Sequence, residues 1–404
     1  MAGKLIRALR PEVLVPVPGL ALAGGGLVVR GEGPEARVRA VLAPGEEPPM
    51  PWQDFPGEVW LPRPILLHAH LEDHDAPTAD LHAAADGFAG WIRALLAWRA
   101  GREADPVASA TAVLDELQRG GAGLVVAHAE APSVRAVAGR RGVLPLLEVL
   151  APGEGGGTAA SAAAAIRRSA AELGAGGVAV HAPYTVGAEL ARALFHGGAL
   201  GSVHLGESAE ERRFLASGDG PLAELLGERG APTPTERFPS PVAWLEACGG
   251  ARPGVLAIHG GDLTAEELVR LERAGVGVVF CPGTHHAFGR PRPAFGAAGG
   301  TPPFLGCDSR ASNPRLHPLR ELRLARATVP EFGPVAWWAS LTTRAAAWLE
   351  DPLRGRIRAG GPLDPLRVRL PVPASHDRPE ALAADLLGAL SELGEAAELI
   401  PGTP

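Results

Sequence analysis

The sequence of 404 residues contains little cysteine, lysine or tyrosine. Its three cysteines, Cys248, Cys281 and Cys307, show no C-x-x-C spacing. This odd, low count argues against a disulfide scaffold and is typical of a reduced protein, so we expect a cytoplasmic location. Lysine occurs only as Lys4 and tyrosine only as Tyr184, a bias that GC-rich coding DNA explains without reference to function.

The chain also lacks clusters of basic residues and long uninterrupted apolar runs. Its formal net charge of −7 argues against binding of nucleic acid through a basic patch. No stretch approaches the roughly 20 apolar residues that a membrane span needs. The segment VLVPVPGLALAGGG faintly resembles a signal peptide, but prolines and Glu12 interrupt it, so we expect no secretion signal. Neither nucleic acid nor a membrane is an expected partner.

The two ends of the chain share one pattern. Short apolar pieces broken by Gly and Pro, such as GGGLVVRG (24–31) and ARVRAVLAPG (36–45), are typical of small antiparallel strands. GRIRAGG (355–361) and LRVRLPVP (366–373) show the same alternation. We therefore predict a small β-sandwich built from residues 1–60 and 354–404, with a final helix near 378–398.

Between these ends, apolar runs rich in β-branched residues alternate with helical patterns over about 280 residues. The eight runs are PILLHAH (64–70), GLVVAHAE (123–130), VLPLLEVL (143–150), GVAVHAPY (177–184), GSVHLGES (201–208), GVLAIHGG (254–261), VGVVFCPG (276–283) and PFLGCDS (303–309). Eight strands, each followed by a helix, predict an α/β fold of the TIM (β/α)8 barrel type over residues 61–353. An open doubly wound sheet is the alternative, but it would need a glycine-rich phosphate turn after the first strand. The sequence has none there.

Barrel enzymes carry their sites at the carboxyl ends of the strands, where this chain places most of the ionisable residues of its predicted strands. His68 and His70 end the first run, and alternation along a strand turns both imidazoles to one side. Alone, such a pair is more often solvated than metal-binding. His204 alone could equally be a hydrogen-bonded core histidine, and Asp308 could cap a helix. Together the four residues predict a site for one divalent ion.

Two further residues stand where a metal-assisted hydrolysis needs them. Glu207 follows His204 by three residues and could shuttle protons, although an acid in the first turn of the next helix is the ordinary alternative. His259 precedes two glycines and could hydrogen-bond the attacking water or the developing oxygen. Taken alone, it would be structural about as often as functional.

With these residues assembled, the chain resembles the amidohydrolase superfamily, and within it the branch that deaminates purines and related rings. Six motifs occur in the order of that family, LPRPILLHAHLE, HAPYTV, VHLGESAEE, AIHGGDLTAEEL, VVFCPGTHHAFGR and LGCDSRASN. The resemblance implies one divalent ion, zinc first and iron or manganese as alternatives, on His68, His70, His204 and Asp308. It makes Glu207 the proton shuttle and His259 the partner of the attacking water, while Asp308 could also accept a proton. A carboxylated lysine between two metals is not expected, because Lys4 is the only lysine.

Within this branch the chain looks most like the aminodeoxyfutalosine deaminases of the alternative menaquinone pathway. The cues are HLE with Glu72, LLEVL with Glu148, and CDSRASN. His181 would contact the substrate, and Glu72 and Glu148 would line its pocket. Because that substrate carries a carboxylate, Arg290, Arg310 and His181 are candidates to bind it. Ala69, Arg310 and PGTHHAFGR depart from the usual pattern, and the last two bear on the substrate pocket.

The expected activity is hydrolytic deamination of an adenine-type ring, with a small nucleoside-like molecule as the partner. A homodimer is left open. Another amidohydrolase activity, on adenosine, adenosylhomocysteine, guanine, a triazine or an imidazolone, is the nearest alternative. A metal-binding scaffold without activity belongs to a different class, which the complete set of ligands and shuttle disfavours. A cytidine-deaminase type of zinc enzyme would need a P-C-x-x-C motif, which the sequence lacks.

Overall fold

The computed structural model describes residues 5–103, 105–151, 158–197, 200–231, 234–372, 378–402 and 404, so Lys4 lies outside the described residues. The chain forms two compact units. One comprises Met1–Leu66, Leu117–Leu124 and His317–Pro404, and the other comprises Leu67–Glu116 and Val125–Leu316. None of the described helices is both long enough and apolar enough to cross a membrane.

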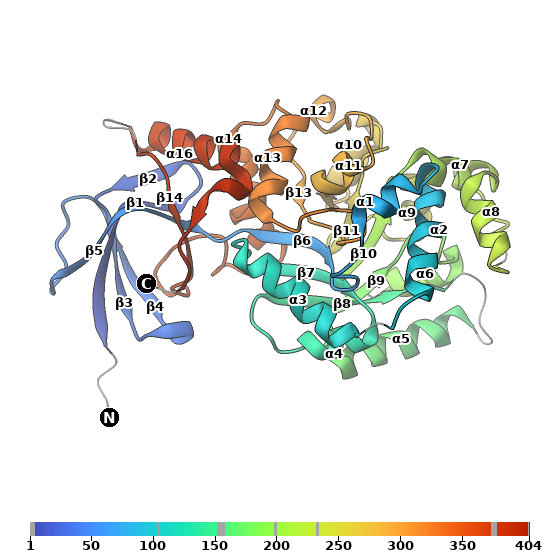
Figure 1. Ribbon diagram of the computed structural model, residues 1–404, viewed down its shortest axis with the longest axis horizontal. Helices are drawn as coiled ribbons and strands as arrows, with labels where there is room; N and C mark the ends of the chain where they lie inside the picture. The colour runs from blue at the N-terminus through green and yellow to red at the C-terminus, as the bar shows by residue number, and fades with distance from the viewer. Residues whose placement is uncertain are drawn as a thin grey trace. The chain divides into compact units, whose positions relative to one another are not determined.

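The first unit is built on one seven-stranded sheet to which both ends of the chain contribute (Figure 1). In sheet order its strands are β15 (Glu398–Leu399), β14 (Pro365–Arg369), β5 (Trp52–Pro62), β1 (Ile6–Val17), β3 (Gly26–Arg30) and β4 (Arg37–Leu42), with β2 (Leu20–Ala23) paired to β1. The prediction of a small β unit made from both ends is therefore confirmed. Its strand pairs are antiparallel as expected, except that β1 and β5 run parallel.

Two predicted elements of this unit turn out differently. Residues 355–361 form bends and turns instead of a strand, and the Ile357 N–H donates to the Pro16 carbonyl oxygen over 2.9 Å. The last helix, α16 (Pro379–Leu393), ends at Gly394, whose left-handed φ of 56° turns the chain back towards β14. Contacts also group three helices with this unit, α13 (Pro318–Thr328), α14 (Pro334–Leu341) and α15 (Thr343–Trp348). The domain boundaries near 60 and 354 stay a prediction.

A buried ion pair joins β5 to β14. The Glu58 carboxylate accepts two hydrogen bonds from Arg367, of 2.8 and 2.9 Å, and a third of 2.7 Å from the Trp60 indole. Both charged side chains are at most 10% exposed. A buried ion pair is tolerated when its hydrogen bonds are satisfied, as they are here, so the pair fixes the first part of the chain to the last.

The second unit holds a barrel of eight parallel strands (Figure 1). In sheet order they are β6 (Ile65–His70), β7 (Leu124–Ala129), β8 (Val143–Val149), β9 (Gly177–Val180), β10 (Leu200–Leu205), β11 (Val255–His259), β12 (Gly277–Phe280) and β13 (Phe304–Leu305). Each lies within or within one residue of an apolar run identified in the sequence. The prediction of a (β/α)8 barrel is confirmed.

Backbone hydrogen bonds connect the first strand to the chain just after the last. The Cys307 N–H donates to the His68 carbonyl oxygen over 2.9 Å, and the His70 N–H donates to the Asp308 carbonyl oxygen over 3.2 Å. Gly306 permits this approach, because a Cβ there would lie 2.8 Å from the His68 carbonyl oxygen and 3.1 Å from the Cys281 sulfur. The connection brings two distant parts of the sequence, each with candidate ligands, side by side.

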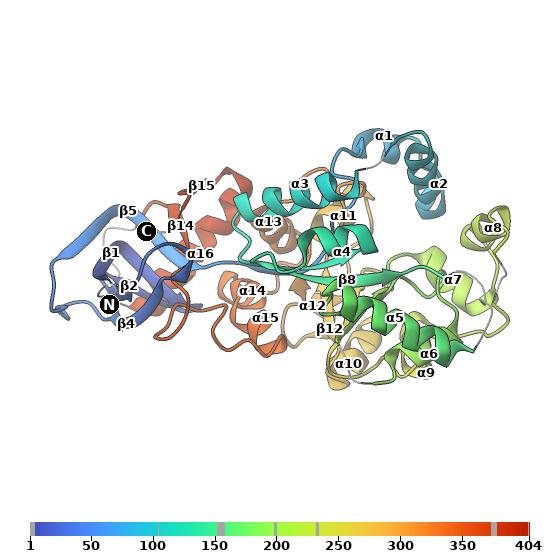
Figure 2. The same ribbon diagram turned by 90° about the horizontal axis from the view of Figure 1, so that it is seen from below.

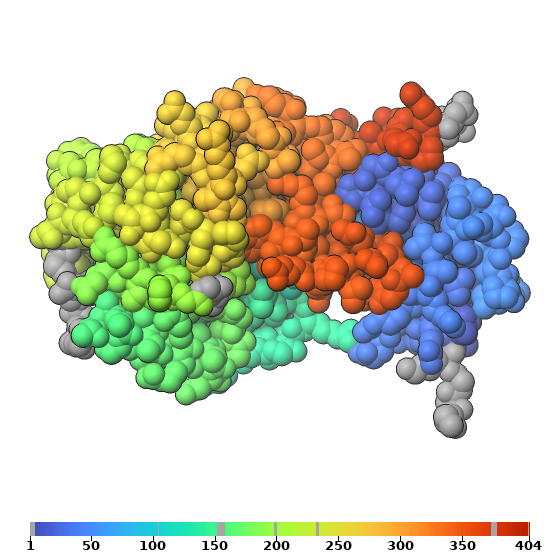
Figure 3. Space-filling model, turned by 180° about the vertical axis from the view of Figure 1, so that it is seen from behind, coloured from blue at the N-terminus to red at the C-terminus, as the bar shows by residue number. Residues whose placement is uncertain are grey.

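The helices of this unit are α1 (Thr78–Ala83), α2 (Gly87–Ala100), α3 (Pro106–Arg119), α4 (Ala131–Val137), α5 (Ala159–Leu173), α6 (Ala188–Phe195), α7 (Ala209–Ser217), α8 (Pro221–Glu228), α9 (Pro241–Ala247), α10 (Ala265–Arg273), α11 (Pro282–Ala287) and α12 (Phe295–Ala298). Helix α4 packs on β8 and α5 packs on β9, and Figure 2 shows α4 beside β8. On the face seen in Figure 3, the yellow to orange part of the chain, which includes α10 to α12, forms much of the surface. Capping residues define where such helices begin, as at α10, where Thr264 and Glu267 form a capping box.

Candidate active site

Four candidate ligands from three parts of the barrel converge at the carboxyl ends of its strands. His68 and His70 come from β6, His204 from β10, and Asp308 from the turn after β13. The Nε2 atoms of His70 and His204 lie 3.2 Å apart. The Oδ1 atom of Asp308 lies 3.4 Å from His68 Nε2 and 3.6 Å from His70 Nε2. Ring nitrogens of His68, His70, His128 and His204 lie within 4.8 Å of one another, and so do the ligand atoms of His204, His259 and Asp308. The four candidate ligands thus belong to one cluster, in which His128 and His259 also take part.

His204 faces the other candidate ligands through Nε2, because its Nδ1 is used in a hydrogen bond. Its Nδ1 donates to the His181 carbonyl oxygen over 2.7 Å, so the proton sits on Nδ1 and Nε2 carries a lone pair. Burial lowers the pKa values of His68 and His70, which favours their neutral forms. Each neutral imidazole offers one nitrogen lone pair, and the Asp308 carboxylate adds a negative charge beside them. Nitrogen and oxygen donors suit zinc and related divalent ions, so the residues fit such an ion.

Asp308 is oriented by two hydroxyl groups. Its Oδ2 accepts hydrogen bonds of 2.8 Å from both Thr284 and Ser312, which leaves Oδ1 directed at the histidines. Burial would raise the pKa of Asp308, but the hydrogen bond with His68 and the neighbouring imidazoles hold it well below its ordinary value. Its φ of 61° is left-handed, a strained conformation typical of functional sites. Asp308 does not cap the next helix, because α13 starts ten residues later at Pro318, with His317 as its N-cap.

Glu207 lies beside this cluster, in the turn between β10 and α7. Its Oε2 is 3.6 Å from His259 Nε2, and its Oε1 accepts a hydrogen bond of 3.1 Å from Arg290. Burial would raise the pKa of Glu207, but His259 and Arg290 lower it below its ordinary value. His259, like Asp308, has a left-handed φ, of 76°. Because Ser208 is the N-cap of α7, Glu207 precedes the helix and is not an acid of its first turn.

No family model matches the chain. A curated relative does, the aminodeoxyfutalosine deaminase of Deinococcus radiodurans, which is 31% identical over 365 residues, 81% of this chain and 82% of that protein. The chain belongs to the amidohydrolase family. It is therefore a hydrolase of the deaminating branch of that family.

Solved structures show that this amidohydrolase has the same fold as other members. The Helicobacter pylori aminofutalosine deaminase bound to methylthio-coformycin superposes with a TM-score of 0.75 at 18% identity, over 95% of this chain and 96% of that one. A guanine deaminase from Bradyrhizobium japonicum gives 0.69 at 16% identity, over 99% and 100%. A zinc-bound adenosine deaminase from Xanthomonas campestris gives 0.67 at 20% identity, over 95% and 90%.

Other candidate residues of the amidohydrolase lie around the same cluster. The Glu148 carboxylate is 3.2 Å from His128 Nδ1 and 3.9 Å from His70 Nδ1. The ring of His181 stacks at a tilt against that of His204, with centroids 5.0 Å apart, and its Nδ1 is 2.7 Å from the Thr185 hydroxyl. These contacts place Glu148 and His181 next to two of the four candidate ligands.

Glu72 and Arg310 form their hydrogen bonds with residues other than the four candidate ligands. The Glu72 carboxylate accepts a hydrogen bond of 3.0 Å from the Glu130 N–H, and burial raises its pKa to about 7. The Arg310 guanidinium pairs with Glu116 at 3.1 Å, and its side chain is 29% exposed. Arg290 is thus the candidate cation that directly contacts Glu207.

Sequence reasoning missed several residues that orient the candidate ligands. Thr284 lies in PGTHHAFGR, which drew attention only as a departure from the family pattern, and Ser312 lies in CDSRASN. Glu211 was given no role from the sequence, but its buried carboxylate accepts hydrogen bonds from the N–H groups of Gly206 and Glu207, 3.0 and 2.8 Å long. His128, buried and 2.8 Å from the Ser202 hydroxyl, carried no assigned role.

An aromatic cluster adjoins Glu207 and Arg290. Phe88 and Trp91 of α2 stack at 6.1 Å between centroids, and Phe288 meets both rings edge to face. Tyr184 meets Phe88 edge to face at 6.2 Å. The amidohydrolase thus offers apolar, flat surfaces beside its polar centre, as an aromatic substrate requires.

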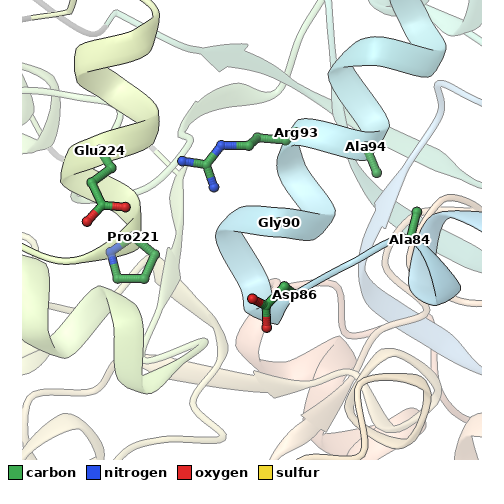
Figure 4. A pocket seen from close by; sticks show the side chains of 7 residues that line it. All are labelled: Ala84, Asp86, Gly90, Arg93, Ala94, Pro221 and Glu224. Carbon is green, nitrogen blue, oxygen red and sulfur yellow. The ribbon is translucent and has the colours of Figure 1, made fainter.

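An open pocket between α2 and α8 is a different feature (Figure 4). It is lined by Ala84, Asp86, Gly90, Arg93, Ala94, Pro221 and Glu224. None of these residues belongs to the histidine cluster, so the pocket is not the candidate active site.

Proposed function

We propose that this amidohydrolase replaces the amino group of an adenine-type ring by oxygen, with aminodeoxyfutalosine as its substrate and futalosine and ammonia as its products. The relative from Deinococcus radiodurans supports this substrate. The observation that carries the reaction type is the convergence of His70, His204 and Asp308 beside the Glu207 carboxylate. Such an arrangement suits hydrolysis assisted by one metal ion and one proton shuttle.

In this proposal one divalent ion, zinc first, is held by His68, His70, His204 and Asp308. When bound, the ion supplies a Lewis acid that lowers the pKa of a water molecule to about 7, which makes hydroxide available at neutral pH. Thr284 and Ser312 orient the Asp308 carboxylate, and the His181 carbonyl oxygen orients the His204 ring.

Glu207 moves the protons. It takes a proton from the attacking water and delivers it to the ring nitrogen next to the attacked carbon, so the tetrahedral carbon forms without a buried anion. His259, 3.6 Å from Glu207, stabilises the oxygen on that carbon. Asp308 can accept the remaining proton of that oxygen. The C–N bond then breaks, and the amine leaves as ammonia after it receives the proton that Asp308 accepted.

Three further residues are proposed to contact the substrate. His181 and Glu148 adjoin the candidate ligands and face the ring or the sugar. Glu72, with its pKa near 7, can donate as well as accept a hydrogen bond at neutral pH. Arg310 is a weaker candidate for the substrate carboxylate than Arg290, because Arg290 contacts the proposed shuttle Glu207 whereas Arg310 is paired with Glu116.

The test is a substrate panel with ammonia detection. Purified protein, analysed for metal, is incubated with aminodeoxyfutalosine, adenosine, adenosylhomocysteine, guanine and a triazine. We expect the highest kcat/KM for aminodeoxyfutalosine and about one equivalent of a divalent ion per chain. A higher kcat/KM for another member of the panel would overturn the substrate but not the deaminase. Ammonia release from none of them by metal-replete protein would sink the reaction itself.

A further inference from the structure

We propose that Arg290 acts as an anion-operated latch on Glu207. In the absence of an anionic substrate it holds the Glu207 carboxylate, and a carboxylate on the substrate draws it away and frees Glu207 for proton transfer. This inference rests on the proposed function and deepens it, because it makes an anionic group a requirement for fast turnover rather than an aid to binding alone.

The side chains of Arg290 and Glu207 are in direct contact. Arg290 Nη2 lies 3.1 Å from Glu207 Oε1, and both side chains are largely buried, with 13% and 8% exposed. A proton shuttle must offer one carboxylate oxygen to the ring nitrogen of the substrate. Here Arg290 occupies Oε1, and His259 stands 3.6 Å from Oε2. Arg290 must therefore give way before Glu207 can serve both the water and the ring.

The surroundings of Arg290 allow such a movement. Its guanidinium carbon lies 4.5 Å from the centroid of Phe288 and 5.5 Å from that of Phe88. A planar guanidinium can shift across aromatic faces while keeping favourable cation–π contact. The same faces suit an aryl group. An aryl carboxylate would then find flat walls and a cation together.

The energetics favour exchange over simple release. Pulling Arg290 from Glu207 without a replacement leaves two buried charges unpaired, which is strongly unfavourable. A substrate carboxylate keeps the guanidinium paired while Glu207 turns to its new partners. A neutral substrate offers no such replacement, so it must either leave the latch closed or bear the cost of opening it.

Two other arginines near the site are paired with other carboxylates. Arg310 is paired with Glu116, and Arg99 is paired with the buried carboxylate of Asp73. Neither pairing involves the proposed shuttle. Among the cations that the structure describes around this site, Arg290 is the one in hydrogen-bond contact with Glu207.

The test compares an acid with its neutral counterpart in wild-type protein and in Arg290→Met. The substrates are aminodeoxyfutalosine and its carboxamide, which differ in charge but hardly in shape. We expect wild type to prefer the acid by at least about a hundredfold in kcat/KM, with a large part of the difference in kcat. In Arg290→Met the preference should fall to within about threefold, and kcat on the carboxamide should rise above the wild-type value.

The rise in kcat separates a latch from a merely structural residue, whose loss would lower both rates. Arg93→Met is the matched control. Arg93 also forms an arginine–glutamate pair, with Glu228 at 2.8 Å, but away from the shuttle. It should retain the wild-type preference. Metal content and circular dichroism confirm that each variant is folded.

Several outcomes would overturn the latch. These are an unchanged preference in Arg290→Met, an equal loss on both substrates, or a wild type that treats acid and carboxamide alike. In the last case turnover of both compounds would leave the proposed deaminase standing. If wild type instead deaminates only other adenine-type nucleosides, the proposed substrate fails. The latch is then judged by the same comparison between adenosine and its 5′-carboxylate.

Discussion

His70 and His204 face each other through their Nε2 atoms at 3.2 Å, although they stand 134 positions apart in the sequence. The Nδ1 atom of His204 carries a proton, because it donates a hydrogen bond to the His181 carbonyl oxygen. The Nε2 atom of a neutral His204 therefore carries a lone pair, which can accept a hydrogen bond from His70 or bind a cation. Burial lowers the pKa of His70, which favours its neutral form, so the pair suits a shared cation.

Removal of the metal should accordingly abolish activity and lower stability. Chelation removes the ion that the proposed ligands bind and on which the proposed hydroxide depends. At a metal concentration about 100 times the Kd, the ion contributes about 2.7 kcal/mol to the free energy of unfolding. We expect a lower Tm for chelated protein, restored together with activity by zinc. His204→Gln should fail to regain either, whereas His196→Gln, at an exposed position after α6, should behave as wild type.

Thr284→Val should weaken metal binding without removing a ligand. The valine keeps the shape of the side chain but loses the 2.8 Å hydrogen bond to Asp308 Oδ2, so of the two hydroxyl groups only that of Ser312 still orients this oxygen. Loss of such an orienting partner costs about 10- to 100-fold in metal affinity. Competition with a chromogenic chelator measures the Kd. Thr328→Val, which removes a hydroxyl bonded within α13 to the Leu324 carbonyl oxygen, should leave the Kd unchanged.

The convergence of the candidate ligands could be predicted from the sequence, but the groups that orient them could not. Strand alternation placed His68 and His70 on one side, and strand ends located His204 and Asp308, because both signals are local. Thr284 lies 24 positions before Asp308, and nothing local in PGTHHAFGR reveals its direction. The position of an acidic residue in the sequence does not reveal its hydrogen-bond partners either. Glu211 bonds backward to Gly206 and Glu207, while Glu210 accepts from the N–H groups of Phe88 and Ala89 at the start of α2.

The barrel was easier to predict than the small sheet for the same reason. Eight apolar runs separated by helical patterns leave few topologies, because parallel strands need crossover connections. Alternation in the terminal segments showed that strands were present but not their direction. The parallel pairing of β1 with β5 therefore emerged only from the structure.

Glu211 should make stability depend on pH. Burial raises its pKa to about 8, despite the two backbone N–H donors that lower it, so the folded protein binds this proton more tightly than the unfolded chain does. The free energy of unfolding should therefore fall as pH rises from about 4.5 to about 8. Glu211→Gln should show a shallower fall, measured as urea midpoints across this range. A slope equal to that of wild type and of the exposed Glu189→Gln control would contradict the assignment.

Glu207→Gln should separate binding from chemistry. The amide keeps the size of the side chain and can still accept a hydrogen bond from Arg290, but it cannot carry a proton between the water and the ring. Glu207 is not one of the four proposed ligands, so metal content should stay at the wild-type level. We expect kcat to fall at least roughly a hundredfold, with a much smaller change in KM. Steady-state kinetics on metal-analysed protein, with exposed Glu266→Gln as the matched control, provides the measurement. Near-normal turnover by Glu207→Gln would exclude Glu207 as the proton shuttle. The proposed latch would then fail as well, because Arg290 would not control a catalytic carboxylate.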